Sequence, residues 1–443
     1  MAISRTRSVD GGPAGEGTRF EISNAYRSYV IAVIWLVMLL RFVDLQIIAV
    51  LLESIRAEFR VSDTQLGLLS GFAFALFYGT LGIPIAWLAD RYNRRNIIAA
   101  AVGLWSAMTA VCGLAQSFLA LLLARVGVGV GEAGGAPPSY SLISDYVRPE
   151  KRGTVFALLN SSVPVGLFIG FLVGGWVNEY HGWRAAFMVV GLPGIAVALL
   201  VRFTLREPPR GHSEQRTAGA PSPLSETLRY LWSVRAYRHL VLATSIFTLG
   251  AYGTGIWVPS FFVRVHGMNG GEVATWLAFI YGSGGALGVV LGGVLADRLA
   301  AARGDRRWYV WLPAIASVSI MPFSFLVYLW PDAYQAMLLQ LGTTTLMYSW
   351  MGPAYGTVQS LAGVERRAMA AAINMLVVNL ISLGLGPLIV GVASDYFNAH
   401  FGTESLRYSI LTLAVVAFTW AGVHFHLAAR TLREDLARAE ARA

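Results

Sequence analysis

The chain has 443 residues, of which 56% are hydrophobic and 13% charged, and its mean hydropathy is +0.57. A soluble domain has about 45–50% apolar and about 25% charged residues, so this composition excludes a string of soluble domains and a disordered chain and indicates an integral membrane protein with many spans. The net charge of +9 is spread over short runs between apolar stretches, which excludes a nucleic-acid partner, and the single cysteine, Cys112, excludes a disulfide framework and a cysteine metal site.

The chain opens with residues 1–26, a polar, glycine-rich stretch without the apolar segment of a signal peptide, which we expect to be a disordered cytoplasmic tail. Twelve apolar stretches follow, and a membrane-spanning helix needs about 20 such residues. They lack the period-two alternation of barrel strands, so we expect an all-α membrane protein with twelve transmembrane helices. The expected spans are 27–52, 64–89, 96–116, 118–144, 153–178, 183–203, 238–263, 273–296, 309–330, 333–359, 368–394 and 406–429.

The placement of arginine and lysine predicts the orientation. With the amino terminus inside, 27 of the 34 basic residues fall in cytoplasmic segments and five in outside loops, and the remaining two, Arg41 and Arg125, lie within spans. Cytoplasmic segments of membrane proteins carry an excess of basic residues, so we expect both termini in the cytoplasm and the protein in a bacterial inner membrane or an equivalent one.

One long connection divides the spans into two sets of six. Residues 204–237 are rich in proline and charge, which predicts a cytoplasmic linker between a first bundle, 27–203, and a second bundle, 238–429, followed by a tail, 430–443. The segment LSETLRYLW in this linker places Leu224, Leu228 and Leu231 on one helical face. A helix on the membrane surface explains this pattern, and a regulatory docking site is the alternative.

The two halves resemble each other in sequence. AWLADR at 86–91 matches GVLADR at 293–298. In a second patch, the residues Pro138, Tyr140, Glu150 and Arg152 match, in this order, Pro353, Tyr355, Glu365 and Arg367. Parallel repeats of this kind form two bundles that face each other across a central cavity. Such an architecture suits alternating access, in which the bundles rock to open the cavity to either side.

Several motifs carry a family resemblance. ADRYNRRN at 89–96 resembles the loop motif of major facilitators, and together with RVGVGVGEAG at 125–134, PVG at 164–166 and LREPPRG at 205–211 it is similar to the Spinster family. The resemblance implies a twelve-span secondary-active transporter that is linked to protons, and in eukaryotic members the cargo is sphingosine phosphate or a lysophospholipid. The first span departs from the family pattern: RFVDLQ keeps Asp44, but the arginine stands three residues before it, at Arg41.

Four ionisable side chains lie deep within spans: Arg41, Asp44, Arg125 and Glu132. Because a charge at mid-membrane is costly unless it is paired or hydrated, we expect these four side chains to have a specific role. Arg41 and Asp44 share a helix face and so do Arg125 and Glu132; the resemblance implies that both spans line the cavity, which predicts one network of four charges. We interpret Asp44 and Glu132 as proton sites. When one of them is protonated, its arginine partner, Arg41 or Arg125, is released and can bind an anionic head group. The alternative is an ion-pair staple, that is, permanent ion pairs that only hold the two helices together.

The loop charges at the cytoplasmic span ends predict a gate. Asp90 with Arg91, Arg94 and Arg95, and Asp145 with Arg152, are placed to pair across helices and lock the cytoplasmic side. Arginines that only follow the orientation rule are the alternative.

The second half has no comparable buried acid or base. Its candidate cavity residues are neutral or aromatic: Tyr252, Trp257, Thr344, Tyr348, Tyr355, Asn374 and Asn379. A charged wall opposite an aromatic wall fits an amphiphile with a charged head. Ordinary packing is the alternative for each aromatic residue.

These patterns together predict a proton-coupled transporter of an amphiphilic, lipid-like molecule, embedded in the bilayer as a monomer, without cofactor or metal. A multidrug or organic-anion porter of the same fold is the alternative, and a lipid-modifying membrane enzyme lacks any supporting motif.

Overall fold

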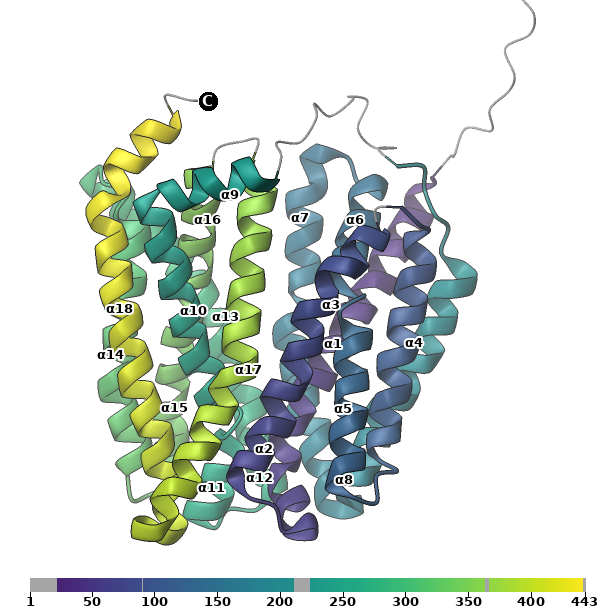
Figure 1. Ribbon diagram of the computed structural model, residues 1–443, viewed down its shortest axis with the longest axis vertical. Coiled ribbons are helices and arrows are strands. Elements are labelled where there is room, and N and C mark those ends of the chain that lie inside the picture. The colour runs from purple at the N-terminus through teal and green to yellow at the C-terminus, as the bar shows by residue number, and fades with distance from the viewer. Residues whose placement is uncertain (1–21, 90, 211–223, 363–365, 441–443) are drawn as a thin grey trace, which may run out of the picture.

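The computed structural model describes residues 22–89, 91–210, 224–362 and 366–440, and these residues form helices and short connections (Figure 1). The first half contains α1 (Asn24–Phe59), α2 (Asp63–Gly67), η1 (Leu68–Phe72), α3 (Ala73–Ala89), α4 (Arg94–Cys112), α5 (Phe118–Glu132), α6 (Ala136–Tyr146), α7 (Pro149–Asn160) and α8 (Ser162–Thr204). After α9 (Leu224–Ser233), the second half contains α10 (Arg235–Gly255), α11 (Val258–His266), α12 (Gly270–Phe279), η2 (Ile280–Gly284), α13 (Gly285–Arg303), α14 (Trp308–Leu329), α15 (Ala333–Tyr348), α16 (Met351–Ala362), α17 (Arg367–Phe401), η4 (Gly402–Glu404) and α18 (Ser405–Glu440).

The twelve predicted crossings are confirmed within the described residues. Nine stretches are long and apolar enough to cross a membrane. Two of them contain two crossings each, because α8 is interrupted at Gly182, which has φ 81°, and α17 is followed by α18 after Gly402, which has φ 53°. Glycine adopts such angles without the steric cost that other residues incur. The helices α15 and α16 supply the remaining crossing.

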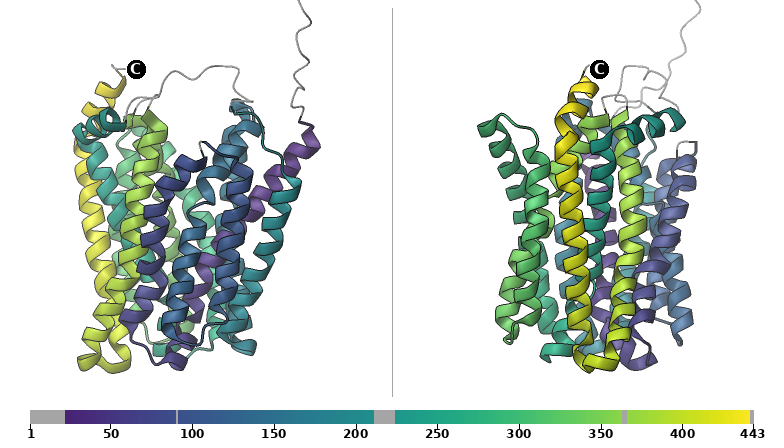
Figure 2. Two further views of the ribbon diagram at one scale, coloured as in Figure 1. Left: turned by 45° about the vertical axis from the view of Figure 1, so that its right-hand side comes forward. Right: turned by 60° about the vertical axis from the view of Figure 1, so that its left-hand side comes forward.

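The two ends of the molecule differ. The end where α1 begins and α18 finishes also carries α9, and we call it the terminal end; the opposite end is the distal end (Figures 1 and 2). The helix α18 continues to Glu440, through most of the region expected as a tail. On α9, Leu231 is buried against the second half and the Tyr230 hydroxyl donates a hydrogen bond to the Leu361 carbonyl, while Leu228 remains 44% exposed.

Close helix packing in the first half depends on glycine. A Cβ atom added to Gly131 of α5 would lie 2.5 Å from the backbone nitrogen of Trp105 on α4, and one added to Gly129 would lie 2.7 Å from the carbonyl oxygen of Phe74 on α3. Both distances are too short for a real side chain, so these glycines allow α5 to approach its neighbours, as small residues do between membrane helices. This approach places the charged residues of α5 in the bundle interior.

The hydrogen bonds and ion pairs that the structure describes between the two halves gather at the distal end. There Arg264 of α11 binds Glu53 and Asp63 of the first half, and the Asp395 carboxylate of α17 accepts hydrogen bonds from the backbone N–H groups of Asp63 and Thr64. The backbones also approach closely here, because a Cβ on Gly67 would lie 2.6 Å from the Pro387 carbonyl oxygen. The two halves therefore seal against each other at the distal end.

Candidate functional site

The four charged side chains predicted within spans lie together between α1 and α5. Arg41 Nε lies 3.1 Å from Glu132 Oε2, and Arg125 Nη1 lies 3.7 Å from Asp44 Oδ2. Arg41 and Asp44 share a face of α1, and each of them pairs with the opposite charge on α5. Two ion pairs therefore tie the two helices together.

The two pairs differ in burial. Asp44, Arg125 and Glu132 are at most 2% exposed, whereas 12% of the Arg41 side chain is exposed. Arg41 is therefore the more accessible of the two cations in this cluster. From the sequence, Arg125 was the stronger candidate for the cation that binds the head group, but its complete burial argues against direct contact in this conformation.

Two neutral residues complete the cluster. The Thr109 hydroxyl of α4 donates a hydrogen bond of 2.7 Å to Asp44 Oδ1, and Arg41 Nη2 donates one of 2.9 Å to the Tyr78 hydroxyl of α3. Neither residue was predicted from the sequence. Their only signal was polarity within an apolar stretch, which many membrane residues share.

The hydrogen-bonding capacity of the cluster is incompletely used. Among the described residues, Asp44 Oδ2, Glu132 Oε1 and the three side-chain nitrogens of Arg125 find no hydrogen-bond partner. A buried ion pair offsets its desolvation only when its remaining donors and acceptors are satisfied. The cluster thus keeps free sites for a proton, water or an anion, which a purely structural staple does not need.

Four of the residues predicted for the opposite wall retain exposed surface: Tyr252, Tyr348, Tyr355 and Asn379. Tyr252 of α10 is the most exposed of the aromatic members, at 39%, and Tyr348 and Tyr355 are partly exposed. These four residues are therefore the members of the predicted wall that remain accessible.

The other three predicted wall residues lie inside the second half. Trp257 is fully buried and its indole N–H donates to the Pro387 carbonyl, Asn374 accepts a hydrogen bond from the Thr244 hydroxyl, and Thr344 is also fully buried. Residue type alone does not distinguish a helix face that packs from one that lines a cavity.

The charges at the terminal end pair within the first half. Arg94 lies between Asp145, at 2.5 Å, and Glu207 of the linker, at 2.7 Å. Arg91 stacks on Trp87 with its Cζ atom 3.8 Å from the ring centroid, and Arg152 donates to the carbonyls of Val147 and Ser144. Asp90, the centre of the predicted gate, lies outside the described residues.

Linker residues fill the terminal end of the first half. The Glu207 carboxylate accepts hydrogen bonds from Arg94 Nε and from the backbone N–H of Arg95, and Arg210 donates to the Ala89 carbonyl. The Arg95 side chain binds the Leu205 carbonyl. Glu207 lies within the LREPPRG motif, but the motif alone did not indicate that its carboxylate binds Arg94 on α4.

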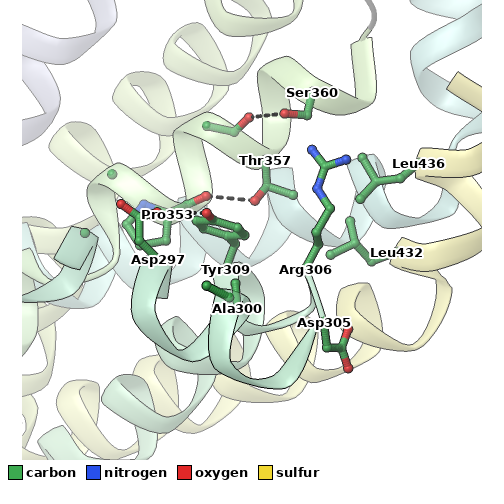
Figure 3. Close-up of a pocket in the computed structure, with 15 residues that line it drawn as sticks. Asp297, Ala300, Asp305, Arg306, Tyr309, Pro353, Thr357, Ser360, Leu432 and Leu436 are labelled. Atoms are coloured by element: carbon green, nitrogen blue, oxygen red, sulfur yellow. Dashed lines mark hydrogen bonds between the residues drawn. The ribbon is translucent and has the colours of Figure 1, made fainter. Parts of the chain in front are cut away.

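The matching place in the second half is open. Beside the second copy of the repeated motif, a crevice of about 730 Å³ lies between α13, α14, α16 and α18 (Figure 3). Asp297, Arg306 and Tyr309 line it, and Leu432 and Leu436 of α18 line one side. The difference arises because α18 continues as a helix where the chain after α8 turns back across the bundle.

Comparisons with known proteins agree with this architecture. A family model described as the Major Facilitator Superfamily matches residues 34–387. An MFS-type efflux pump of Mycolicibacterium smegmatis is 30% identical over 92% of this chain and 93% of its own. A cis,cis-muconate transport protein of Acinetobacter baylyi is 27% identical over 86% of this chain and 89% of its own. A sphingosine-1-phosphate transporter of Danio rerio is 25% identical over 83% and 76%, respectively.

A solved structure shows the same similarity. The crystal structure of a bacterial homolog to the human lysosomal transporter Spinster, in an inward-facing and unoccupied conformation, is 32% identical to this chain. It superimposes with a TM-score of 0.85 over 93% of this chain and 99% of that one.

Proposed function

Because this chain belongs to the Major Facilitator Superfamily and is a Spinster-type transporter, we propose that it carries an anionic amphiphile of the lysophospholipid or sphingolipid type by proton-coupled alternating access. The observation that carries the proposal is the pairing of Arg41 with Glu132 and of Arg125 with Asp44 between α1 and α5. A lipid phosphate and the Glu132 carboxylate are chemically similar partners for one guanidinium group. Competition between them links cargo to protons.

The steps follow from the geometry. A proton that reaches Glu132 neutralises the carboxylate that faces Arg41, and the 3.1 Å ion pair weakens. The Arg41 guanidinium then binds a phosphate through two parallel hydrogen bonds, a geometry that lysine cannot make. The Tyr78 hydroxyl, at 2.9 Å, holds the guanidinium in place.

The seal at the distal end supports an inward-facing assignment for this conformation. The solved relative with a TM-score of 0.85 is itself described as inward-facing and unoccupied. We assign the terminal end to the cytoplasm, in agreement with the distribution of basic residues. In a Cys112→Ala background, Ser62→Cys should then react with an impermeant thiol reagent only from outside, and Ser360→Cys only from inside.

Transport in proteoliposomes tests the function. Oleoyl lysophosphatidic acid and sphingosine 1-phosphate should move faster when a pH gradient is imposed, and Glu132→Gln should abolish this dependence on the gradient. Arg184→Gln, which removes a 2.6 Å pair with Glu58 inside the first half, is the matched control and should keep it. Transport of neither lipid would contradict the lipid assignment.

A small organic anion is a second candidate, because the muconate transport protein and the efflux pump match most of this chain. A dicarboxylate would use the same Arg41. The same vesicles loaded with cis,cis-muconate distinguish the candidates: transport of muconate without transport of either lipid favours the organic-anion porter.

A further inference from the structure

A second polar cluster, separate from the four charges, lies inside the second half. It consists of Tyr281 of η2, Tyr328 of α14, and Gln340 and Thr344 of α15, which are 7%, 1%, 0% and 0% exposed. The helix α15 packs against both η2 and α14. The methyl carbon of Thr344 lies 3.3 Å from the position that a Cβ on Gly284 of η2 would take. Three crossings thus bring neutral polar groups to one place.

The polar atoms of this cluster are unpartnered. Among the described residues, the hydroxyls of Tyr281, Tyr328 and Thr344 and both amide atoms of Gln340 have no hydrogen-bond partner. Buried polar side chains are satisfied in the large majority of cases. Unsatisfied atoms gathered around one glutamine therefore point to a ligand rather than to packing alone.

The backbone at Tyr281 supports this reading. Residues Ile280–Gly284 form a π-helical turn, and such turns occur frequently at functional sites. The first half has a π-helical turn at the corresponding position, Leu68–Phe72, 212 residues earlier. The ring of Tyr281 lies 5.2 Å from that of Phe171 on α8, so the turn stands at the contact between the two halves.

Two further phenol groups lie near the cluster. The Tyr281 hydroxyl lies 3.3 Å from the position that a Cβ on Gly255 would take, three residues after Tyr252 on α10, and the Tyr348 ring lies 3.7 Å from that of a Cβ on Gly285, four residues after Tyr281. Tyr252 and Tyr348 also retain exposed surface. A cargo with its anion at Arg41 would pass these rings to reach Tyr281.

We propose that Tyr281, Tyr328, Gln340 and Thr344 form a second substrate subsite, which binds a neutral hydrogen-bonding group of the cargo, such as a hydroxyl, an ester or an amide. The amide and the hydroxyls both donate and accept hydrogen bonds, so they suit such a group. The cluster contains no charge to pair with a second ionic group, whose burial there would be costly. This inference rests on the proposed function for the anion at Arg41, and it adds that the preferred cargo carries a neutral polar group as well.

Two matched probes test the subsite. Oleoyl lysophosphatidic acid and oleyl phosphate share the chain length and the phosphate, but the second lacks the ester and the hydroxyl. Tyr281→Phe and Gln340→Met should weaken binding of lysophosphatidic acid to the purified protein about tenfold, as expected for a lost buried hydrogen bond, and leave oleyl phosphate unchanged. Ser317→Ala is the control, because this buried, unpartnered hydroxyl lies between α14 and α18. Equal losses for both probes, or no loss for either, would overturn the proposal.

Thiol labelling tests the subsite without any cargo. In a Cys112→Ala background, Thr344→Cys should react with a small methanethiosulfonate reagent, whereas Ser317→Cys should not. Failure of the purified protein to bind either lipid would count against the lipid function, while labelling of Thr344→Cys would still support an accessible polar subsite. Absence of labelling, with Tyr252→Cys labelled as the exposed control, would overturn the subsite whatever the cargo is.

Discussion

Arg264 of α11 and Asp63 of α2 form an ion pair between the two halves of the molecule, with Arg264 Nη1 2.7 Å from Asp63 Oδ2 and neither side chain more than 9% exposed. The same guanidinium binds Glu53 of α1, and Asp63 also accepts a hydrogen bond from the Ser394 hydroxyl of α17. Four helices thus meet at one charged cluster. A transporter that opens its distal end must break this cluster.

Removal of the Arg264 cation should shift the protein toward the distal-open state. We expect Arg264→Gln to raise the population of that state by an amount that corresponds to about 1–3 kcal/mol, the usual size of such couplings. Spin labels on α2 and α17 measure the separation of the two halves. Arg184→Gln at the same end breaks a pair within the first half only and should leave the distances unchanged. If the distances are unchanged in Arg264→Gln as well, the contacts of Arg264 do not control the opening of the distal end.

The two buried carboxylates should respond differently to neutralisation. Asp44→Asn leaves Arg125 fully buried beside a neutral side chain, and loss of a buried partner costs about 3–5 kcal/mol, so we expect a large drop of the thermal midpoint. Glu132→Gln leaves Arg41, which is 12% exposed, so the midpoint should fall less. Transport by Glu132→Gln should be independent of pH. Similar midpoint losses in both variants, with pH-dependent transport retained, would favour the ion-pair staple.

The sequence was sufficient for the fold because hydropathy and the placement of basic residues are local properties. The composition of the charged site was also accessible, since a span contains few ionisable residues unless they serve a purpose. The pairing of these charges was not accessible from the sequence. The positions of Arg41 and Asp44 on one helix do not determine which face of α5 lies opposite them. The two ion pairs across α1 and α5 depend on the glycine contacts of α5, which only the packed structure reveals.

The distal seal and the linker contact were missed for a related reason. Arg264, Glu53 and Asp63 lie near span ends, where a charge in sequence is indistinguishable from an ordinary loop residue. Glu207 lies in a proline-rich linker whose path across α4 is set by tertiary contacts. Trp257 was assigned to the cavity wall by residue type, and its indole N–H instead binds the Pro387 carbonyl inside the second half.

Asp305 at the terminal end should make stability depend on acid pH. Hydrogen bonds from Arg307, and then from Arg433 of α18, lower the pKa of the Asp305 carboxyl to about 2. Because the folded protein holds the ionised form, this contribution to stability is present above about pH 4 and disappears as the pH falls toward 2. The thermal midpoint of Asp305→Asn should lie below that of the native protein at pH 5–7, and the gap should narrow toward pH 3.

A control on α18 isolates the effect. Glu434 has a side chain that is 74% exposed, so Glu434→Gln should follow the native protein at every pH. A constant gap between Asp305→Asn and the native protein across the whole range would mean that Asp305 stabilises the fold by shape rather than by charge.

The two buried arginines should separate cargo binding from stability. Arg41→Lys keeps the charge beside Glu132 but removes the paired hydrogen bonds that a guanidinium offers to a phosphate, so we expect the affinity for oleoyl lysophosphatidic acid to fall about tenfold, with a small change in thermal midpoint. Arg125 is fully buried against Phe74 and Asp44, so Arg125→Lys should lower the midpoint and leave the affinity nearly unchanged. Tyr78→Phe, which removes only the hydroxyl that accepts from Arg41, should weaken binding less than Arg41→Lys does. The reverse outcome, with affinity lost in Arg125→Lys and kept in Arg41→Lys, would show that the cargo reaches the inner pair, and that the α1–α5 interface opens during binding.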